Sequence, residues 1–366
     1  MLAKPGIQSI SAYQGGRPVE EVQRELGLTD VIKMASNENP LGPSKRAVDA
    51  MAEAVASVHF YPDGNAYYLK NAVAEFHDVA PEQLLFGNGS SDVLQILGET
   101  YIAAGDHIVF PEQSFVVYSL ISAIFDARTT TPPLTNDGYD LATLAAAVTE
   151  DTKLVFVANP NNPTGTYVTK RELDTFFDAI PASVMVVLDE AYFEYIDRDD
   201  YPDGLDYLRA GRNVIVTRTF SKAYGLAGLR VGYGVASPEV IEMMNRARPP
   251  FNVNSLAQTA ARAALEDVTH VERSRALTLA GMETLTAGVT KLGLSFVPSV
   301  ANFLLVHLGR DGQQVTEALT RHGVIVRPMG GYRYPRSVRV TVGTATQNER
   351  FLGALAEVLQ EIPEAS

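Results

Sequence analysis

Four polar segments follow short apolar runs of the chain, and their residue types suit anion binding and acid–base chemistry. They contain serines, asparagines, a lysine, two arginines and two aspartates. If the apolar runs are strands of one parallel sheet, their carboxyl ends meet at one edge, where ligands bind in open α/β sheets. We therefore expect the four segments to share one site. They are residues 87–92, 159–165, 189–192 and 218–230.

Each segment also has a plain structural interpretation. The loop that begins at Gly87 suits a phosphate held on backbone N–H groups where a helix begins, or a tight turn, and it lacks the G-x-G-x-x-G spacing of a dinucleotide site. Asp189 suits either a ligand contact or a helix cap. Lys222 and Arg230 suit either chemistry or a solvated surface. Taken singly, none of them identifies a reaction.

The elements that must position these residues fall into two groups. From Leu84 to Val235, β-branched apolar runs alternate with helical segments, which predicts a mostly parallel sheet covered on both faces. From about Pro249 a long helical region leads into further strands and helices, which predicts a smaller α+β domain. The predicted division is an N-terminal arm (1–35), a large domain (36–250) and a small C-terminal domain (251–366).

Composition limits the classes of protein that this chain can be. It has 366 residues, of which 46% are hydrophobic and 20% charged, so it can bury a large core. The net charge of −13 argues against nucleic-acid and anionic-membrane partners, so an anionic ligand would need a local basic pocket. With no cysteine and six scattered histidines, no disulfide, thiolate or metal site is expected.

The chain also lacks the segments that direct proteins to membranes or to export. No apolar run approaches the roughly 20 residues that span a bilayer. Residues 1–10 lack the basic start and long apolar stretch of a signal peptide. A cytoplasmic location is therefore expected.

Together, the motifs resemble those of the fold-type I aminotransferases, which depend on pyridoxal 5'-phosphate (PLP). Thr219–Tyr233 is similar to the lysine motif of that family, and Asn161–Gly165 and Asp189–Tyr192 are similar to two motifs that precede it in the same order. The chain most resembles the histidinol-phosphate aminotransferase subfamily, and the similarity extends from about residue 13 to 350. The segments that carry this closer resemblance are 37–44, 61–64 and 338–344.

The resemblance implies a role for each cofactor-binding residue. Lys222 would form the Schiff base with PLP and carry the proton, and Asp189 would hold the pyridine nitrogen protonated. Tyr192 and Asn162 would bond the phenolic oxygen, and Phe115 would stack on the ring. The residues implied to hold the phosphate are Ser90, Ser91, Thr219, Ser221 and Arg230, with Tyr61 reaching it from the partner subunit of a homodimer with a shared active site.

The resemblance also implies a substrate pocket and a reaction. Arg339 would take the α-carboxylate of glutamate or the phosphate of histidinol phosphate, and Arg327, Tyr13 and Asn37 would make further contacts. The implied transaminase reaction of histidine biosynthesis has small-molecule partners. It converts L-histidinol phosphate and 2-oxoglutarate, the 2-oxo acid acceptor, to imidazole acetol phosphate and L-glutamate.

Two departures from the family pattern leave other activities open. Ser90-Ser91-Asp92 stands where most relatives have an acidic pair after the Gly-x-Gly loop. The segment 329–335 is individual, and Arg333 is expected to add positive charge to the pocket. The alternatives are an aromatic (phenylalanine or tyrosine) aminotransferase and a PLP-dependent decarboxylase on the same fold. A non-catalytic binding protein is disfavoured because both Lys222 and Asp189 are present.

Overall fold

A seven-stranded sheet forms the centre of the larger part of the molecule. The computed structural model describes residues 3–10, 12 and 15–364. Strand β8 runs antiparallel to both of its neighbours, and the other strand pairs are parallel. In spatial order the strands are β2 (Leu84–Gly87), β8 (Gly232–Val235), β7 (Val214–Thr219), β6 (Met185–Asp189), β5 (Thr152–Ala158), β3 (His107–Val109) and β4 (Arg128–Thr130).

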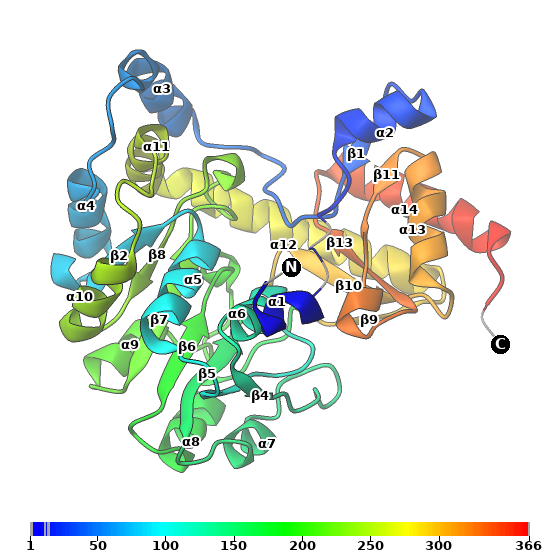
Figure 1. Cartoon of the computed structure of the whole chain (residues 1–366). Coiled ribbons are helices and arrows are strands. Elements are labelled where there is room, and N and C mark those ends of the chain that lie inside the picture. Colours follow the sequence, from blue (N-terminus) through cyan, green and yellow to red (C-terminus); the bar gives the residue numbers. More distant parts are fainter. Residues whose placement is uncertain (1–2, 11, 13–14, 365–366) are drawn as a thin grey trace.

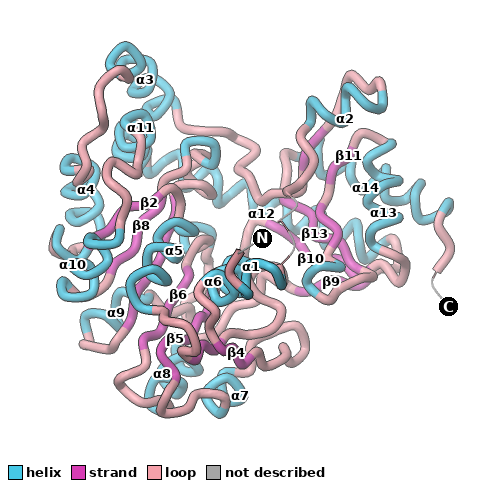
Figure 2. Tube along the Cα trace, viewed as in Figure 1, coloured by secondary structure: helices cyan, strands magenta, loops and turns pink. Residues whose placement is uncertain are grey.

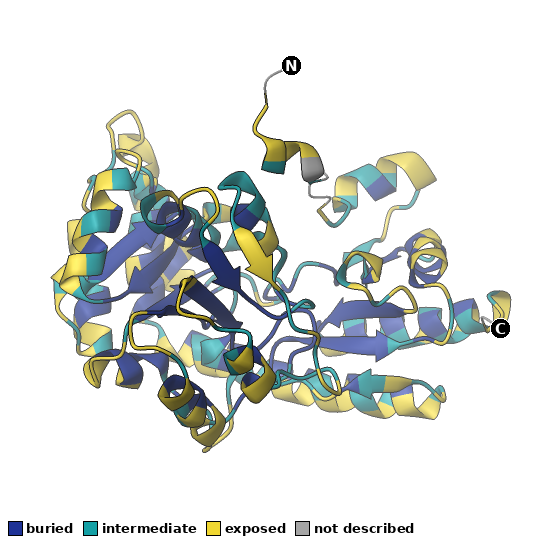
Figure 3. Cartoon of the chain, turned by 60° about the horizontal axis from the view of Figure 1, so that its bottom comes forward, coloured by how far each residue is buried: buried dark blue, intermediate teal, exposed yellow. Residues whose placement is uncertain are grey.

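Helices cover both faces of this sheet, as expected for parallel strands that are buried on both sides (Figure 1). One face packs against α5 (Ser90–Tyr101), α6 (Val116–Ile124) and α10 (Pro238–Ala247). Figure 3 shows most of the strands buried and the outer helix faces exposed, while strand β4 at the edge of the sheet is exposed. The other face packs against α3 (Lys45–Ala54), α4 (Tyr67–His77), α7 (Leu141–Ala146), α8 (Lys170–Ala179), α9 (Gly204–Arg209) and α11 (Ser255–Leu265).

A second, antiparallel sheet lies apart from the first (Figure 2). Its strands in order are β12 (Arg327–Pro328), β13 (Ser337–Thr341), β10 (Phe303–His307) and β9 (Ser295–Val297). Its core includes side chains of α12 (Val268–Lys291), α13 (Gly312–Arg321) and α14 (Ala345–Glu361).

The N-terminal residues join this second part. Strand β1 (Ile32–Lys33) pairs in parallel with β11 (Val324–Ile325), and α2 (Val19–Leu26) packs on the same place through Val22. Helix α1 (Pro5–Ser9) instead packs beside α6, and the Gly6 N–H donates to Oδ1 of Asp126, just after that helix, at 2.8 Å. The remaining short 3₁₀ turns are η1 (Val55–Ser57), η2 (Pro81–Gln83), η3 (Phe193–Tyr195), η4 (Ala227–Leu229) and η5 (Gly330–Tyr332).

The division into domains is a proposal, and the packing favours a boundary between the large and small domains that lies after residue 250. Helix α11 begins at Ser255, beyond the predicted boundary at 250, yet Ala257 and Ala261 pack in the core of the large sheet. The long helical region expected after Pro249 consists of two helices, α11 and α12, and Asp267 caps α12 by accepting the His270 N–H at 3.2 Å. We therefore propose a boundary within α12, which runs between the two parts (Figure 1).

The strand ends bring the predicted segments together. Ala158 pairs with Asp189 across β5 and β6, and Asp189 pairs with Thr217 across β6 and β7. Side chains alternate along a strand, so Thr217 and Thr219 lie on one face and Arg218 on the other. Arg218 is fully buried there, with Nη2 2.7 Å from both Glu190 Oε2 and Asp203 Oδ1.

The described residues give no sign of a membrane span or a metal centre. None of their helices is both long and apolar enough to cross a bilayer. Nor do three or more histidine, cysteine, aspartate or glutamate side chains gather among them as a metal-binding group.

Candidate active site

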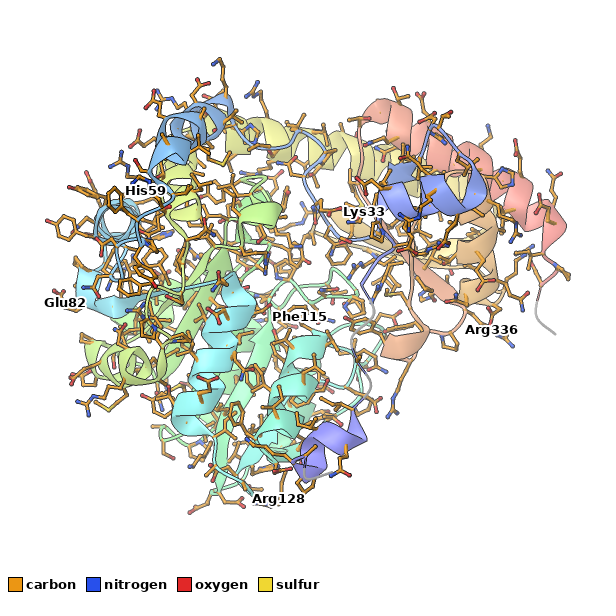
Figure 4. All side chains as sticks on the ribbon, turned by 45° about the horizontal axis from the view of Figure 1, so that its top comes forward. Lys33, His59, Glu82, Phe115, Arg128 and Arg336 are labelled. Atoms are coloured by element: carbon orange, nitrogen blue, oxygen red, sulfur yellow. The ribbon has the colours of Figure 1, made fainter. Side chains whose placement is uncertain are left out.

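A pocket lies where the carboxyl ends of β5, β6 and β7 face the second sheet. Phe115, labelled in Figure 4, lines it near the middle of the molecule. Every predicted site residue except Tyr13 and Tyr61 lines this pocket. These residues are Asn37, Ser90, Ser91, Phe115, Asn162, Asp189, Tyr192, Thr219, Ser221, Lys222, Arg230, Arg327 and Arg339.

Lys222 presents an amine whose pKa is lowered toward neutrality. It follows β7, and its Nζ donates to the Ser36 carbonyl oxygen at 3.3 Å. Burial lowers the pKa of Lys222 to about 8, helped by the positive charges of Arg339 and Arg230. A lysine in this state is neutral often enough to act as a nucleophile or a base near pH 8.

Asp189 presents a buried carboxylate at the end of β6. The Tyr118 hydroxyl donates to its Oδ2 at 2.8 Å and the Thr217 hydroxyl to its Oδ1 at 3.2 Å. Burial raises the pKa of Asp189, and these two hydrogen bonds oppose the rise. A carboxylate in such a place is stabilised by a cationic partner in the pocket, such as a protonated ring nitrogen.

A cradle for an anion lies beside Lys222. The Arg230 guanidinium reaches the Ser221 hydroxyl and the Asn88 carbonyl oxygen, each at 3.3 Å, and Ser221 accepts a 3.0 Å hydrogen bond from Thr219 Oγ1. Ser90 begins α5, a helix of 12 residues, so its N-terminal N–H groups face the same place. Two hydroxyls, a guanidinium and a helix N-terminus suit a phosphate.

Glycines keep this cradle open. Gly89, with φ of 83°, adopts the left-handed conformation, and a Cβ there would lie 2.5 Å from Arg230 Nη2. A Cβ on Gly232 would lie 2.4 Å from the Ser90 backbone nitrogen. The close approach of backbone and arginine at this point therefore requires glycine.

A polar network surrounds the Tyr192 hydroxyl at the pocket. Asn37 Nδ2 donates to the Tyr192 hydroxyl at 2.9 Å, and the Thr341 hydroxyl donates to Asn37 Oδ1 at 3.3 Å. Burial raises the pKa of Tyr192 to about 12, so its hydroxyl stays protonated and can donate. The Asn37 side chain, expected to touch substrate, thus also positions Tyr192.

Two arginines from the second sheet form a concentrated positive site. Arg327 and Arg339 stand directly opposite each other across β12 and β13, and both line the pocket. Arg339 donates to Asn162 Oδ1 and, at 3.0 Å, to the Ala35 carbonyl oxygen. Like charges directly opposite in a sheet repel, so an anionic ligand is favoured here.

Tyr61 and Tyr13 are the two predicted site residues that are not among those lining the pocket, each for its own reason. Tyr61 is 83% exposed and stacks on Phe251, with ring centroids 4.9 Å apart, away from the pocket of its own chain. That position leaves open the expected contribution from a partner subunit. Tyr13 lies outside the described residues.

The structure corrects one expectation and adds residues that were missed. Arg333 does not charge the pocket, because its Nη1 lies 2.5 Å from Glu112 Oε1 and its side chain is 72% exposed. Its neighbour Tyr332 lines the pocket instead. Tyr118 was missed, although it stands only three residues after Phe115, which precedes the first residue of α6, and the two rings meet edge to face with centroids 5.9 Å apart.

The donor set of the pocket fits PLP. Asp189 suits the ring nitrogen, Phe115 the ring face, Lys222 the aldehyde and the cradle around Arg230 the phosphate. Arg327 and Arg339 then remain for an anionic substrate.

Comparisons with known proteins point the same way. The sequence pattern of the aminotransferase class I and II family matches residues 29–355. The chain is 52% identical to the histidinol-phosphate aminotransferase of Moorella thermoacetica over 357 residues, 97% of this chain and 92% of that protein. It is 48% identical to histidinol-phosphate aminotransferase 1 of Nitrosococcus oceani, covering 98% and 97% of the two chains.

Solved structures share the fold. The crystal structure of the Sinorhizobium meliloti histidinol-phosphate aminotransferase in complex with pyridoxal-5'-phosphate superposes with a TM-score of 0.91, at 29% identity and with 98% of each chain covered. A double mutant of the Thermus thermophilus aspartate aminotransferase superposes with a TM-score of 0.85, at 23% identity and with 98% and 100% of the chains covered. The predicted fold class and the predicted cofactor, PLP, are confirmed.

Proposed function

The chain belongs to the class I and II aminotransferases, and we propose that its reaction is histidinol-phosphate transamination in histidine biosynthesis. L-Histidinol phosphate and 2-oxoglutarate would give imidazole acetol phosphate and L-glutamate. The observation that carries this proposal is the pairing of Arg327 with Arg339 across β12 and β13, which places two positive charges side by side in the pocket. Such a site suits the phosphate of one substrate and a carboxylate of the other.

The residues of the pocket divide between holding the cofactor and moving a proton. PLP, when bound, supplies an electron sink for cleavage of bonds to the substrate Cα. Lys222 would take the proton from Cα, because its lowered pKa leaves its amine partly neutral. Asp189 would keep the ring nitrogen protonated, and Tyr192 and Asn162 would donate hydrogen bonds to the phenolic oxygen.

The other predicted residues have proposed roles in binding. Phe115 would cover the ring face, and Arg339 and Arg327 would orient the substrate anion. Asn37 and Tyr13 would make further substrate contacts. The phosphate would lie on Ser90, Ser91, Thr219, Ser221 and Arg230.

A panel of amino donors tests the proposal. Purified enzyme with PLP and 2-oxoglutarate is given histidinol phosphate, phenylalanine or tyrosine, and kcat/KM is compared. The proposal expects histidinol phosphate to be preferred by at least tenfold. A preference for phenylalanine or tyrosine would overturn it and favour the aromatic aminotransferase. Release of carbon dioxide would favour the decarboxylase.

The role of Lys222 has its own test. Lys222→Ala is expected to lose the visible absorption of the lysine-bound cofactor and to lose transamination. A band that persisted in the variant would show that another residue carries the cofactor. Lys153→Ala, at a half-exposed lysine paired with Asp106 at 2.7 Å, serves as the control.

We propose a homodimer in which Tyr61 completes the partner's active site. Large apolar side chains are exposed along the 48–68 region: Val55 is 54% exposed, Phe60 69%, Tyr61 83% and Tyr68 69%. His59, labelled in Figure 4, marks this outer surface. Contiguous exposed apolar residues of this kind favour an interface between subunits.

Mixing two inactive variants tests the shared site. In a mixed dimer of Tyr61→Ala and Lys222→Ala chains, one site has both an intact lysine and an intact tyrosine. Random re-pairing of equal amounts makes half of the dimers mixed, so about a quarter of the wild-type activity is expected. A mixture without recovered activity, or a monomer by sedimentation, would overturn the proposal.

A cytoplasmic location goes with the proposed function, because the reaction draws on the cell's glutamate and 2-oxoglutarate. Cell fractionation followed by assay of each fraction checks it.

A further inference from the structure

Tyr332 is an aromatic residue of the pocket that the proposed function does not use. The described aromatic residues that line the pocket are Phe115, Tyr192 and Tyr332. Phe115 and Tyr192 are assigned to the cofactor, so Tyr332 remains for the substrate. It lies between the two substrate arginines in the sequence and enters the pocket from the same side of the molecule.

Tyr332 stands at the edge of the pocket. It lines both the pocket and a neighbouring groove along α13, and Gly16 and Arg327 are also common to the two. Tyr332 therefore lies where the space around Lys222 adjoins this groove. A side chain in this place sets how far a substrate can extend from Cα.

Apolar side chains pack behind the Tyr332 ring. It packs against a buried apolar cluster of Val297, Leu305 and Met329. Its backbone N–H donates to the Met329 carbonyl oxygen at 2.9 Å, which closes the turn η5. Arg333 follows with φ of 63°, in the left-handed conformation that ends the turn. A ring packed in this way has less conformational freedom to lose on binding than an exposed ring, so it suits a wall of the pocket.

Two contacts join this turn to the large sheet's side of the molecule. Arg333 pairs with Glu112 at 2.5 Å, and the Tyr334 hydroxyl donates to Asp137 Oδ1 at 2.7 Å. Glu112 lies three residues before Phe115 on the same segment. Tyr332 is thus held against the large sheet's side of the pocket by the two residues that follow it, and one of them, Arg333, pairs with the segment that carries Phe115.

We propose that Tyr332 determines specificity for amino donors with a flat aromatic ring. Its ring is the surface on which the substrate ring lies, while Arg327 and Arg339 bind the anionic group. Arg333–Glu112 and Tyr334–Asp137 keep that surface in place. The inference rests on the proposed function for the identity of the donor, an imidazole, but it applies to any flat-ring donor that the enzyme accepts.

Aromatic contact gives the expected size of the effect. Removing a packed ring removes both buried area and ring–ring contact, which corresponds to about a tenfold loss in kcat/KM or more. Glutamate has no ring, so removing the Tyr332 ring removes no such contact from this substrate. The ratio of kcat/KM for the ring-bearing donor to that for glutamate is therefore the quantity that reports on Tyr332.

The experiment compares Tyr332→Ala and Tyr332→Phe with the wild type in each half-reaction. Single turnovers with histidinol phosphate, phenylalanine and glutamate are followed by the absorbance of the bound cofactor. Tyr332→Ala is expected to lower the ring-to-glutamate ratio about tenfold, mainly through KM, and Tyr332→Phe is expected to keep it within about twofold. Equal losses for both kinds of donor would overturn the inference, as would an unchanged ratio in Tyr332→Ala.

The wild-type result separates this inference from the proposed function. If the wild type prefers phenylalanine, histidinol-phosphate transamination fails, but the ratio for phenylalanine still tests Tyr332. The supporting contacts are tested with Tyr334→Phe and Arg333→Gln, alone and together. Each is expected to lower the same ratio by a few fold, and ratios that stay at the wild-type value in the double variant would overturn the supporting role.

Discussion

The Tyr118 hydroxyl donates a 2.8 Å hydrogen bond to Oδ2 of Asp189, inside the core beneath the pocket. Tyr118 is fully buried and its ring stacks on Phe156, with centroids 4.6 Å apart. Burial raises the pKa of the Tyr118 hydroxyl well above its ordinary value, so the proton stays on Tyr118. The bond therefore favours the ionised form of Asp189, which is the form that a protonated ring nitrogen needs.

Tyr118→Phe is expected to weaken PLP binding. The substitution keeps the ring and removes one hydrogen bond to a buried carboxylate, a loss of about 1.5–3 kcal/mol, or roughly tenfold to a hundredfold in Kd. Titration of the apoenzyme with PLP, followed by absorbance, measures the effect.

A matched control removes the same kind of bond far from the pocket. Tyr207 donates to Asp174 Oδ1 at 2.7 Å between α9 and α8. Tyr207→Phe is expected to leave the PLP Kd within about twofold of the wild type. If both variants weakened binding equally, the loss would reflect general destabilisation and the role of Tyr118 would be refuted.

The pH dependence of cofactor attachment reports on Lys222. Only the neutral amine attacks an aldehyde, and the pKa of Lys222 is lowered from its ordinary value to about 8. The rate at which apoenzyme captures PLP is thus expected to rise with pH below 8 and to level off above it. Stopped-flow absorbance between pH 7 and 9.5 measures it, a range in which the cofactor phosphate stays ionised.

The charge of Arg339 is expected to affect the pH dependence of the rate of PLP capture. Its positive charge is the second cause of the lowered pKa of Lys222, after burial. Arg339→Gln is expected to shift the bend of the profile to higher pH. If the rate of PLP capture by the wild type kept rising up to pH 9.5 without levelling off, that result would contradict the lowered pKa of Lys222.

Gly89→Ala tests the phosphate cradle. The new Cβ would occupy a left-handed position and press on Arg230 Nη2, so the arginine would have to move off the phosphate. A PLP Kd raised by about tenfold is expected. Gly228→Ala is the control, because a Cβ there would have nothing within 4 Å. If Gly89→Ala and Gly228→Ala had comparable Kd values for PLP, the result would contradict phosphate binding by the cradle.

Much of the site could be predicted because its residues belong to short segments that follow strands. Asp189, Asn162 and Lys222 are each close to the end of a buried apolar run, and parallel strands bring such ends to one edge. The alternation of apolar runs and helices predicted the large sheet for the same reason. Strand β4 was missed because its residues, 128–130, are exposed and carry no apolar pattern.

The rest depended on contacts between distant segments. The role of Tyr118 needs the 71-residue separation from Asp189 to be closed by folding. Arg333 was expected to add positive charge to the pocket. Its residue type does not reveal the left-handed backbone conformation with which its side chain pairs with Glu112. Tyr332 was overlooked beside it, since only the folded turn shows which neighbour enters the pocket.

The acid sensitivity of the fold is expected to depend on His77. Its Nδ1 lies 3.3 Å from Arg218 Nη1, which can only donate, so Nδ1 must accept and the proton of the neutral ring is on Nε2, which donates to the Tyr233 hydroxyl at 2.7 Å. Burial, and then the charge of Arg218, lower the pKa of His77 to about 3, from an ordinary value of 6.5.

The sign of the effect follows from which state binds the proton. Between pH 6.5 and 3 the unfolded chain protonates this histidine and the folded chain does not, so stability falls as pH falls through that window, by at most about 1.4 kcal/mol per pH unit. His77→Gln keeps an acceptor and a donor without a titrating group. Relative to the wild type, it is expected to gain stability as pH falls from 6.5 to 4.5, measured by urea unfolding at each pH. His59→Gln, at an exposed histidine, should track the wild type. Parallel curves for His77→Gln and the wild type would show that His77 is not the group responsible.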